Sequence, residues 1–198
     1  MIAYHIDRRN NRSVGEILKL DTDYFTDWKE YSSYIYSLFP DGLSEHGNTY
    51  LDPAIFQTNL PLSIDELCDL SSFSNSHLIE AFFELIRRNL FPTLPSRLQC
   101  FFGVEQLSDF KYWPELFEAD NKVFQIQFEQ EQSIKLDASF LTGGISVQAN
   151  PEKLEAQFAF PHLFKSAISY WSGKTSNSPK FEILVKPPIL IAKEVQLL

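Results

Sequence analysis

Alternating apolar and polar positions predict most of the β-strands in this sequence. Over residues 2–7, Ile2, Tyr4 and Ile6 alternate with their neighbours, as in a strand with one buried face. Residues 123–129 and 134–140 show the same alternation, and we expect these two strands to pair antiparallel around residues 130–132. The remaining strands are expected at 98–104, 181–185 and 189–192.

Helical spacing of apolar residues predicts helices that are grouped apart from the strands. Helices are expected from about residue 22 to 39, after a capping box at 63–66, from about 75 to 91, and over 105–113. Asn150-Pro151 predicts the start of a further helix, which restarts at Pro161 and ends at Gly173. This order of elements is typical of an α+β fold, with a single domain over residues 1–198.

Composition is that of a globular protein without a disulfide framework. The 198 residues suffice for one domain with a sizeable core, and 44% apolar with 22% charged residues are typical of a folded chain. Cys68 and Cys100 match no metal-ligand spacing, so we expect each to be a buried thiol. With no leader pattern and no stretch apolar enough to cross a membrane, we expect a cytoplasmic protein. The net charge of −9 provides no overall attraction to nucleic acid.

Glu182 is the strongest candidate for a catalytic or ligand-binding residue. It lies in the apolar run 181–185, and a carboxylate there is rarely buried unless it is paired. It either points into a cleft or sits in water at the end of the strand. Taken singly, the other candidates have ordinary explanations as a half-buried histidine, surface arginines and core aromatic residues. They are Tyr4, His5, Arg8, Ser96, Arg97, Phe101 and Phe102.

Together these residues resemble the motifs of the ADP-ribosyltransferase superfamily, in particular small bacterial members of its poly-ADP-ribose-polymerase-like, H-Y-E group. Tyr4-His5 matches the first-strand motif, and Cys100-Phe101-Phe102-Gly103 lies where an aromatic motif precedes a helix. Glu182-Ile183-Leu184-Val185, followed by Pro187, matches the C-terminal motif. The resemblance covers nearly the whole chain. It implies a split β-sheet core with flanking helices, in which NAD binds in a cleft between two small sheets.

The resemblance also implies mono-ADP-ribosyl transfer, with NAD as the substrate and no metal. Glu182 would stabilise the oxocarbenium-like transition state and act as a general base. By the same resemblance, His5, beside Tyr4, would bind the adenosine side of NAD, and Arg8 or Arg97 would bind the pyrophosphate. Phe101 or Phe102 would cover the nicotinamide ring, and Ser96 would contact a ribose.

Two departures from the family pattern narrow the expected activity. Phenylalanine stands where polymerase-like relatives have a stacking tyrosine, and Lys180 stands where arginine-modifying relatives often carry an acidic or amide residue. Both favour a single transfer to an acceptor other than protein arginine. The loop 8–12 is the best local basic patch, and the resemblance implies RNA or DNA as the acceptor, although the net charge of the chain argues the other way; protein is the alternative. Small relatives are often toxins of toxin–antitoxin or phage-defence systems, so an antitoxin or chaperone is the implied partner.

Three other functional classes stay open at this point. The chain could be a non-catalytic NAD-binding module, an interaction protein built on aromatic helices, or a member of the RNA 2′-phosphotransferase branch of the same superfamily. The segment Ser44-Glu45-His46 lacks a nucleophile-elbow motif and therefore does not predict a hydrolase. His77 and His162 are expected to be helix caps or surface groups.

Overall fold

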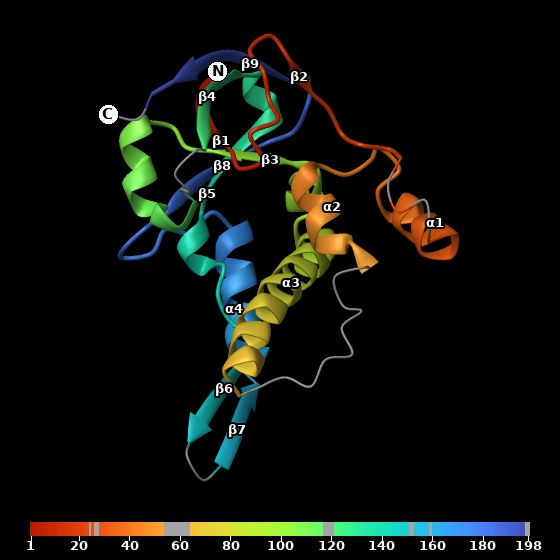
Figure 1. Ribbon diagram of the computed structural model, residues 1–198, viewed down its shortest axis with the longest axis vertical. Coiled ribbons are helices and arrows are strands. Elements are labelled where there is room, and N and C mark those ends of the chain that lie inside the picture. Colours follow the sequence, from red (N-terminus) through yellow and green to blue (C-terminus); the bar gives the residue numbers. More distant parts are fainter. Residues whose placement is uncertain are drawn as a thin grey trace.

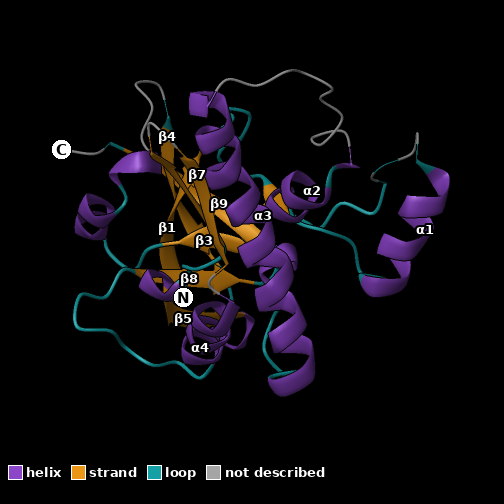
Figure 2. Ribbon diagram, turned by 90° about the horizontal axis from the view of Figure 1, so that it is seen from below, coloured by secondary structure: helices purple, strands orange, loops and turns teal. Residues whose placement is uncertain are grey.

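The computed structural model describes residues 1–23, 25, 28–53, 64–116, 121–150, 153–158 and 160–196. Strands and helices are segregated along much of the chain, as expected for an α+β fold. Two antiparallel sheets curl around a shared interior, with the helices outside them (Figures 1 and 2).

The larger sheet has four strands in the order β1-β4-β9-β2, and the smaller has three in the order β3-β8-β5. A bridge between Tyr4 and Val104 joins β1 to the end of β3, so the two sheets continue into each other. The strands of the larger sheet are β1 (Ile2–Asp7), β4 (Lys122–Gln127), β9 (Ile189–Val195) and β2 (Ile17–Leu18). Those of the smaller sheet are β3 (Phe101–Gly103), β8 (Phe181–Val185) and β5 (Ser133–Asp137).

Two hydrophobic clusters lie on opposite faces of the smaller sheet. Phe101, Ile183 and Val185 point into the interior between the sheets, where they pack with residues of the larger sheet such as Phe124. Leu184 points the other way and packs with the helices. Because successive side chains of a strand alternate between faces, Glu182 shares the helix-facing side of β8 with Leu184.

Four helices flank the sheets in the described part of the chain. They are α1 (Lys29–Leu38), α2 (Glu45–Leu51), α3 (Ile64–Leu90) and α4 (Phe160–Trp171). α3 and α4 cover the helix-facing side of the smaller sheet, and α2 packs beside the 3-10 turn η2 (Arg97–Gln99) (Figure 1). A separate hairpin, β6 (Ile145–Asn150) and β7 (Lys153–Phe158), contacts α3. The other 3-10 turns are η3 (Leu107–Tyr112), η4 (Pro114–Leu116), η5 (Gln130–Gln132) and η6 (Ala138–Phe140). Within the described ranges, no helix is long and apolar enough to cross a membrane.

The structure confirms the strands expected near both ends of the chain. β1 and β8 have the predicted bounds, and β9 extends the predicted second apolar run to Val195. Cys100 is a buried thiol as expected, and burial raises its pKa to about 12. The side chain of Cys68 lies outside what the structure describes, as does Ser63 of the predicted capping box.

The antiparallel pair expected around residues 130–132 is wrong. The strands on either side of η5 separate into different sheets, because β4 has β1 and β9 as its neighbours whereas β5 pairs with β8. Alternation predicted that both strands exist, although β4 ends at Gln127 and residues 138–140 form η6. It carries no information about which strand lies next to which.

Three helix predictions are also corrected. Residues 145–150 and 153–158 form two paired strands instead of the helix expected from Asn150, and α4 begins only at Phe160. The two helices expected after residue 63 are one continuous helix, α3, which passes through Asn75 without a break. Residues 107–112 form a 3-10 turn in place of an α-helix. The first expected helix begins at Lys29; Tyr24, Thr26 and Asp27 lie outside the described residues.

Candidate functional site

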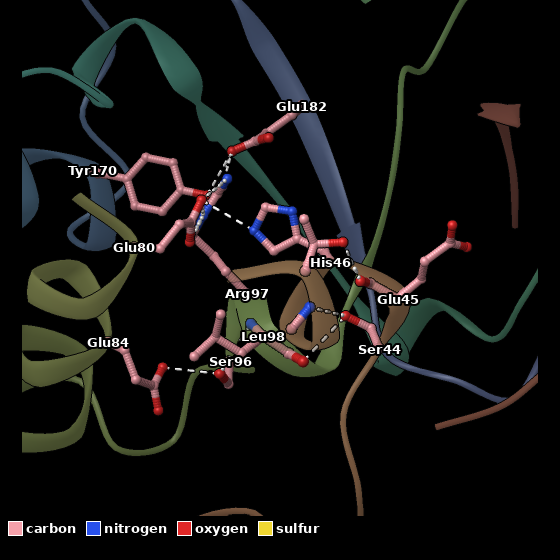
Figure 3. Close-up of polar contacts among 12 residues, drawn as sticks. Ser44, Glu45, His46, Glu80, Glu84, Ser96, Arg97, Leu98, Tyr170 and Glu182 are labelled. Atoms are coloured by element: carbon pink, nitrogen blue, oxygen red, sulfur yellow. Dashed lines mark hydrogen bonds and ion pairs between the residues drawn. The ribbon is translucent and has the colours of Figure 1, made fainter. Parts of the chain in front are cut away.

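Glu182 is buried in the centre of a polar network between the smaller sheet and the helices. Only 3% of the residue is exposed. Its Oε1 atom accepts hydrogen bonds from the guanidinium of Arg97 and from the hydroxyl of Tyr170, the latter at 2.7 Å. In the described part of the chain, Oε2 accepts no hydrogen bond (Figure 3). One oxygen of this carboxylate is therefore fixed, and the other is left for a further contact.

Arg97 is placed by the turn η2, which begins directly after Ser96. The Ser96 hydroxyl accepts a hydrogen bond from the Leu98 amide at 3.2 Å and donates one to Glu84 Oε2 at 2.8 Å. The turn thereby projects Arg97 toward β8, and its side chain is almost fully buried. Ser96 is itself buried and engaged, so it supports the position of Arg97.

Glu80, on α3, is the second carboxylate that binds Arg97. Nε and Nη2 of Arg97 donate to Glu80 Oε1 at 3.1 and 2.9 Å. Burial would raise the pKa of Glu80, but the charge of Arg97 and the adjacent His46 lower it far below its ordinary range. Burial would likewise lower the pKa of Arg97, yet Glu182 and Glu80 raise it well above its ordinary value. Two carboxylates therefore share one buried guanidinium.

Tyr170 closes the network from the side of α4. Arg97 Nη1 donates to its hydroxyl at 2.6 Å, and the hydroxyl donates to Glu182. Burial raises the pKa of Tyr170 well above its ordinary value; the charge of Glu182 adds to this effect and that of Arg97 opposes it. The phenol therefore stays protonated and acts as a permanent donor to Glu182 at neutral pH.

A cluster of half-buried rings lies against this network. The His46 ring packs between Tyr50 and Phe102, with ring centroids 4.5 and 4.6 Å away. The guanidinium of Arg97 covers Phe102 at 4.8 Å from the ring centroid. His46 Nε2 lies 3.1 Å from Glu80 Oε1, at ion-pair distance but without the alignment of a hydrogen bond (Figure 3).

The close approach of α2 to η2 brings His46 to this position. The Ser44 amide donates to the Leu98 carbonyl at 2.9 Å, and the Ser44 hydroxyl caps α2 by accepting from the Gly47 amide. A Cβ atom on Gly47 would lie 2.2 Å from the Leu98 carbonyl oxygen. Only glycine therefore allows α2 to pack against η2 at this distance.

His5 is joined to the same region through β3. Its Nδ1 atom lies 2.7 Å from the carbonyl oxygen of Phe102, and burial lowers its pKa. Tyr4 points to the opposite face of β1, where it packs near Val104 and Phe110. Phe101 is part of the core between the sheets. The ring of His5 lies edge-on to Phe101, with ring centroids 6.2 Å apart, so among the predicted aromatic residues only Phe102 contacts Arg97, the partner of Glu182.

The basic loop after β1 is largely neutralised. Arg9 and Arg12 both pair with Glu45 of α2, at 2.6 and 2.8 Å, and Arg12 also pairs with Glu16. Arg8 is exposed and pairs with no described residue. Its charge counteracts the rise in the pKa of Tyr50, which comes first from burial and then from Glu80. Arg8 is thus the cation of this loop that is left for a ligand, close to the ring cluster.

Glu80 and Tyr170 were missed by sequence reasoning, and His46 was considered only for a hydrolase, which the sequence does not predict. Glu80 and Glu84 lie four residues apart on α3, among several apolar residues of the sequence. A carboxylate on an apolar helix face needs a buried partner, and this is the signal that could have found Glu80. No comparable local signal marks Tyr170 or His46. Among the described residues, no three His, Cys, Asp or Glu side chains gather as metal ligands would.

A surface hollow of about 660 Å³ lies elsewhere, against the larger sheet. Ile2, Ile17, Pro188 and Leu190 are among its lining residues, which include none of the predicted site residues. We therefore build the candidate site on the polar network and the ring cluster, where titratable groups converge, and not on this mainly apolar hollow.

Comparison with known proteins gives one family assignment. A search of curated proteins found no match to this chain. The model of a family described as "Protein of unknown function (DUF2441)" matches residues 3–197, which is almost the entire sequence. The chain therefore belongs to the DUF2441 family.

Proposed function

We propose that this protein is a mono-ADP-ribosyltransferase that moves one ADP-ribose from NAD to a macromolecule, with Glu182 as its catalytic carboxylate. The observation that carries the proposal is the state of Glu182. Arg97 and Tyr170 fix its Oε1, and Oε2 accepts no hydrogen bond in the described part of the chain. A carboxylate held in this way can face the positive charge that develops on a ribose ring as its bond to nicotinamide breaks.

The order of the strands supports the same proposal. β3 pairs with β8 and is bridged to β1, so the strands that bear His5, Phe102 and Glu182 are consecutive neighbours. His5 contacts the carbonyl of Phe102, whose ring contacts Arg97, the partner of Glu182. Residues from distant parts of the chain thus converge on one region, as the proposed NAD site requires.

The contacts also suggest which arginine would bind the pyrophosphate. Arg97 is committed to Glu80, Glu182 and Tyr170, so it positions Glu182 and is not available to a phosphate. Arg8 is exposed, close to Tyr50, and without a partner among the described residues. We therefore assign the pyrophosphate to Arg8 and the nicotinamide face to Phe102.

We propose RNA or DNA as the acceptor, with protein as the alternative. The same proposal includes a role as a toxin or in phage defence, with an antitoxin as the partner. The pairing of Arg9 and Arg12 with Glu45 weakens the electrostatic support for nucleic acid, because two of the three arginines in the loop already have counter-charges.

A non-catalytic module is the second candidate, and the burial of Glu182 favours it. A carboxylate that is 3% exposed and paired with Arg97 can have a purely structural role, in which it fixes how the smaller sheet and the helices pack together. An NAD-binding module would have a higher melting temperature with NAD but would not consume it, whereas an interaction protein would show neither effect.

The deciding experiment supplies labelled NAD to the purified protein with separate pools of RNA, DNA and protein. We expect labelling of one pool and release of nicotinamide, both abolished by Glu182→Gln. The matched control is Glu105→Gln, which alters an exposed carboxylate paired with Lys135. Equal labelling by wild type and Glu182→Gln, or no labelling and no NAD binding by wild type, would rule out the proposed function.

A further inference from the structure

The ring of His46 lies against the buried carboxylate of Glu80 and is itself only partly buried. Its Nε2 lies 3.1 Å from Glu80 Oε1, and its side chain is 20% exposed, whereas that of Glu80 is 7% exposed. Nδ1 has no hydrogen-bond partner among the described residues, although the ring itself is held between Tyr50 and Phe102. The imidazole is thus held in place, with Nε2 beside the Glu80 carboxylate and Nδ1 without a hydrogen-bond partner in the described part of the chain.

Histidines that transfer protons often lie beside a carboxylate, and Glu80 is such a neighbour of His46, at ion-pair distance without hydrogen-bond alignment. An imidazole that gains a proton at one nitrogen becomes a cation, which an adjacent carboxylate stabilises. Glu80 can provide this stabilisation because the network holds two carboxylates, Glu80 and Glu182, against the single guanidinium of Arg97. A proton on His46 would balance the remaining negative charge.

We propose that His46 is the general base of this site and receives the proton of the acceptor through Nδ1. This inference rests on the proposed function. The acceptor's lone pair forms a bond to C1″ of the ribose, and the C1″–nitrogen bond breaks with its electron pair, which leaves with neutral nicotinamide. The acceptor's proton passes to His46, and the imidazolium returns it to solvent after the product leaves. Glu182 then stabilises the positive charge on the ribose, so charge stabilisation and proton abstraction are carried out by different residues.

The groups that face His46 come from three elements besides its own position on α2. Glu80 comes from α3, Arg97 from η2 through the Glu80 carboxylate that both contact, and Phe102 from β3; Tyr50 lies on α2 itself.

The test measures NAD consumption by wild type, His46→Ala and His46→Gln, with His162→Ala as the control, because His162 is an exposed histidine on α4. We expect both His46 variants to lower kcat by about 10²- to 10⁴-fold with KM for NAD within about threefold of wild type. Added imidazole should restore part of the activity of His46→Ala.

His46→Gln separates proton transfer from folding, since its amide can still face Glu80 but cannot accept and release a proton. Wild-type kcat in His46→Gln, or loss of NAD binding in place of turnover, would overturn the role of His46 while leaving the proposed function intact. A wild-type protein that neither binds nor consumes NAD overturns both. Titration of NAD should also move the ring resonances of His46 and not those of His162; an unmoved His46 signal would contradict the proposal.

Discussion

Arg97 and Glu182 are 85 residues apart in the chain and form a buried ion pair through a single carboxylate oxygen. The guanidinium reaches Glu182 with Nη1 and Glu80 with Nε and Nη2, so it holds the smaller sheet to α3. The hydroxyl of Tyr170 joins the same oxygen from α4. The geometry of the candidate site therefore depends on one arginine.

Replacing Arg97 with alanine should strongly destabilise the fold. The change leaves two buried carboxylates without a counter-charge, which costs about 3–5 kcal/mol of the free energy of unfolding. Urea denaturation measures the loss. The control is Arg9→Ala, which removes a surface pair with Glu45 and should cost less than about 1 kcal/mol. Similar losses in the two variants would contradict the central role of Arg97.

Tyr170→Phe should impair turnover more than NAD binding. The variant keeps the ring but removes one of the two donors that fix Glu182 Oε1. We expect a loss of about 1.5–3 kcal/mol in stability. We also expect kcat to fall by about ten- to a hundredfold through misplacement of Glu182, with KM for NAD little changed. If kcat equals that of wild type, Tyr170 has no part in positioning the carboxylate.

Acid should destabilise the protein through Glu80 and His5. The folded-state pKa of Glu80 lies below its ordinary value of 4.5, mainly through Arg97 acting against burial. Its contribution to stability is therefore complete above about pH 4.5 and is lost as pH falls toward the folded-state value. Burial lowers the pKa of His5 below 6.5 in the folded protein. As pH falls, the unfolded chain therefore binds a proton at His5 before the folded protein does, and this also favours unfolding. The free energy of unfolding should thus decline from about pH 6.5 downward.

Urea denaturation at a series of pH values tests this decline. Glu80→Gln should flatten the part of the curve below about pH 4.5, because that titration is removed from both states. The control is Glu105→Gln, which changes an exposed carboxylate and should leave the slope as in wild type. An unchanged slope in Glu80→Gln would show that this carboxylate does not have the lowered pKa.

Gly47→Ala should displace α2 and with it His46. The added methyl would meet the Leu98 carbonyl oxygen at 2.2 Å, so the helix must move away from η2. We expect a loss of about 1–3 kcal/mol in stability and reduced turnover. The control is Thr49→Ala, an exposed position on the same helix, which should change stability by no more than about 0.5 kcal/mol. Equal stability of Gly47→Ala and wild type would disprove the close packing.

The sequence located single elements and single residues well where the signal was local. Alternation predicted β1 and an apolar run predicted β8, each with its bounds, and the rarity of a carboxylate in an apolar strand singled out Glu182. Local signals failed at Asn150-Pro151, where a helix start was expected and a hairpin formed instead. Propensity at such a position is weak, and packing against α3 overrides it.

Only the tertiary structure decided which side chains pair in the candidate site. The sequence by itself determined that Glu182 is in a strand and that burial would demand a partner. It did not determine that Arg97 is this partner, that Glu80 and Tyr170 complete the network, or that His46 reaches Glu80 from α2. Strand alternation and helical spacing act over a few residues, whereas these contacts join segments brought together by the packing of α2, α3 and α4 on the smaller sheet.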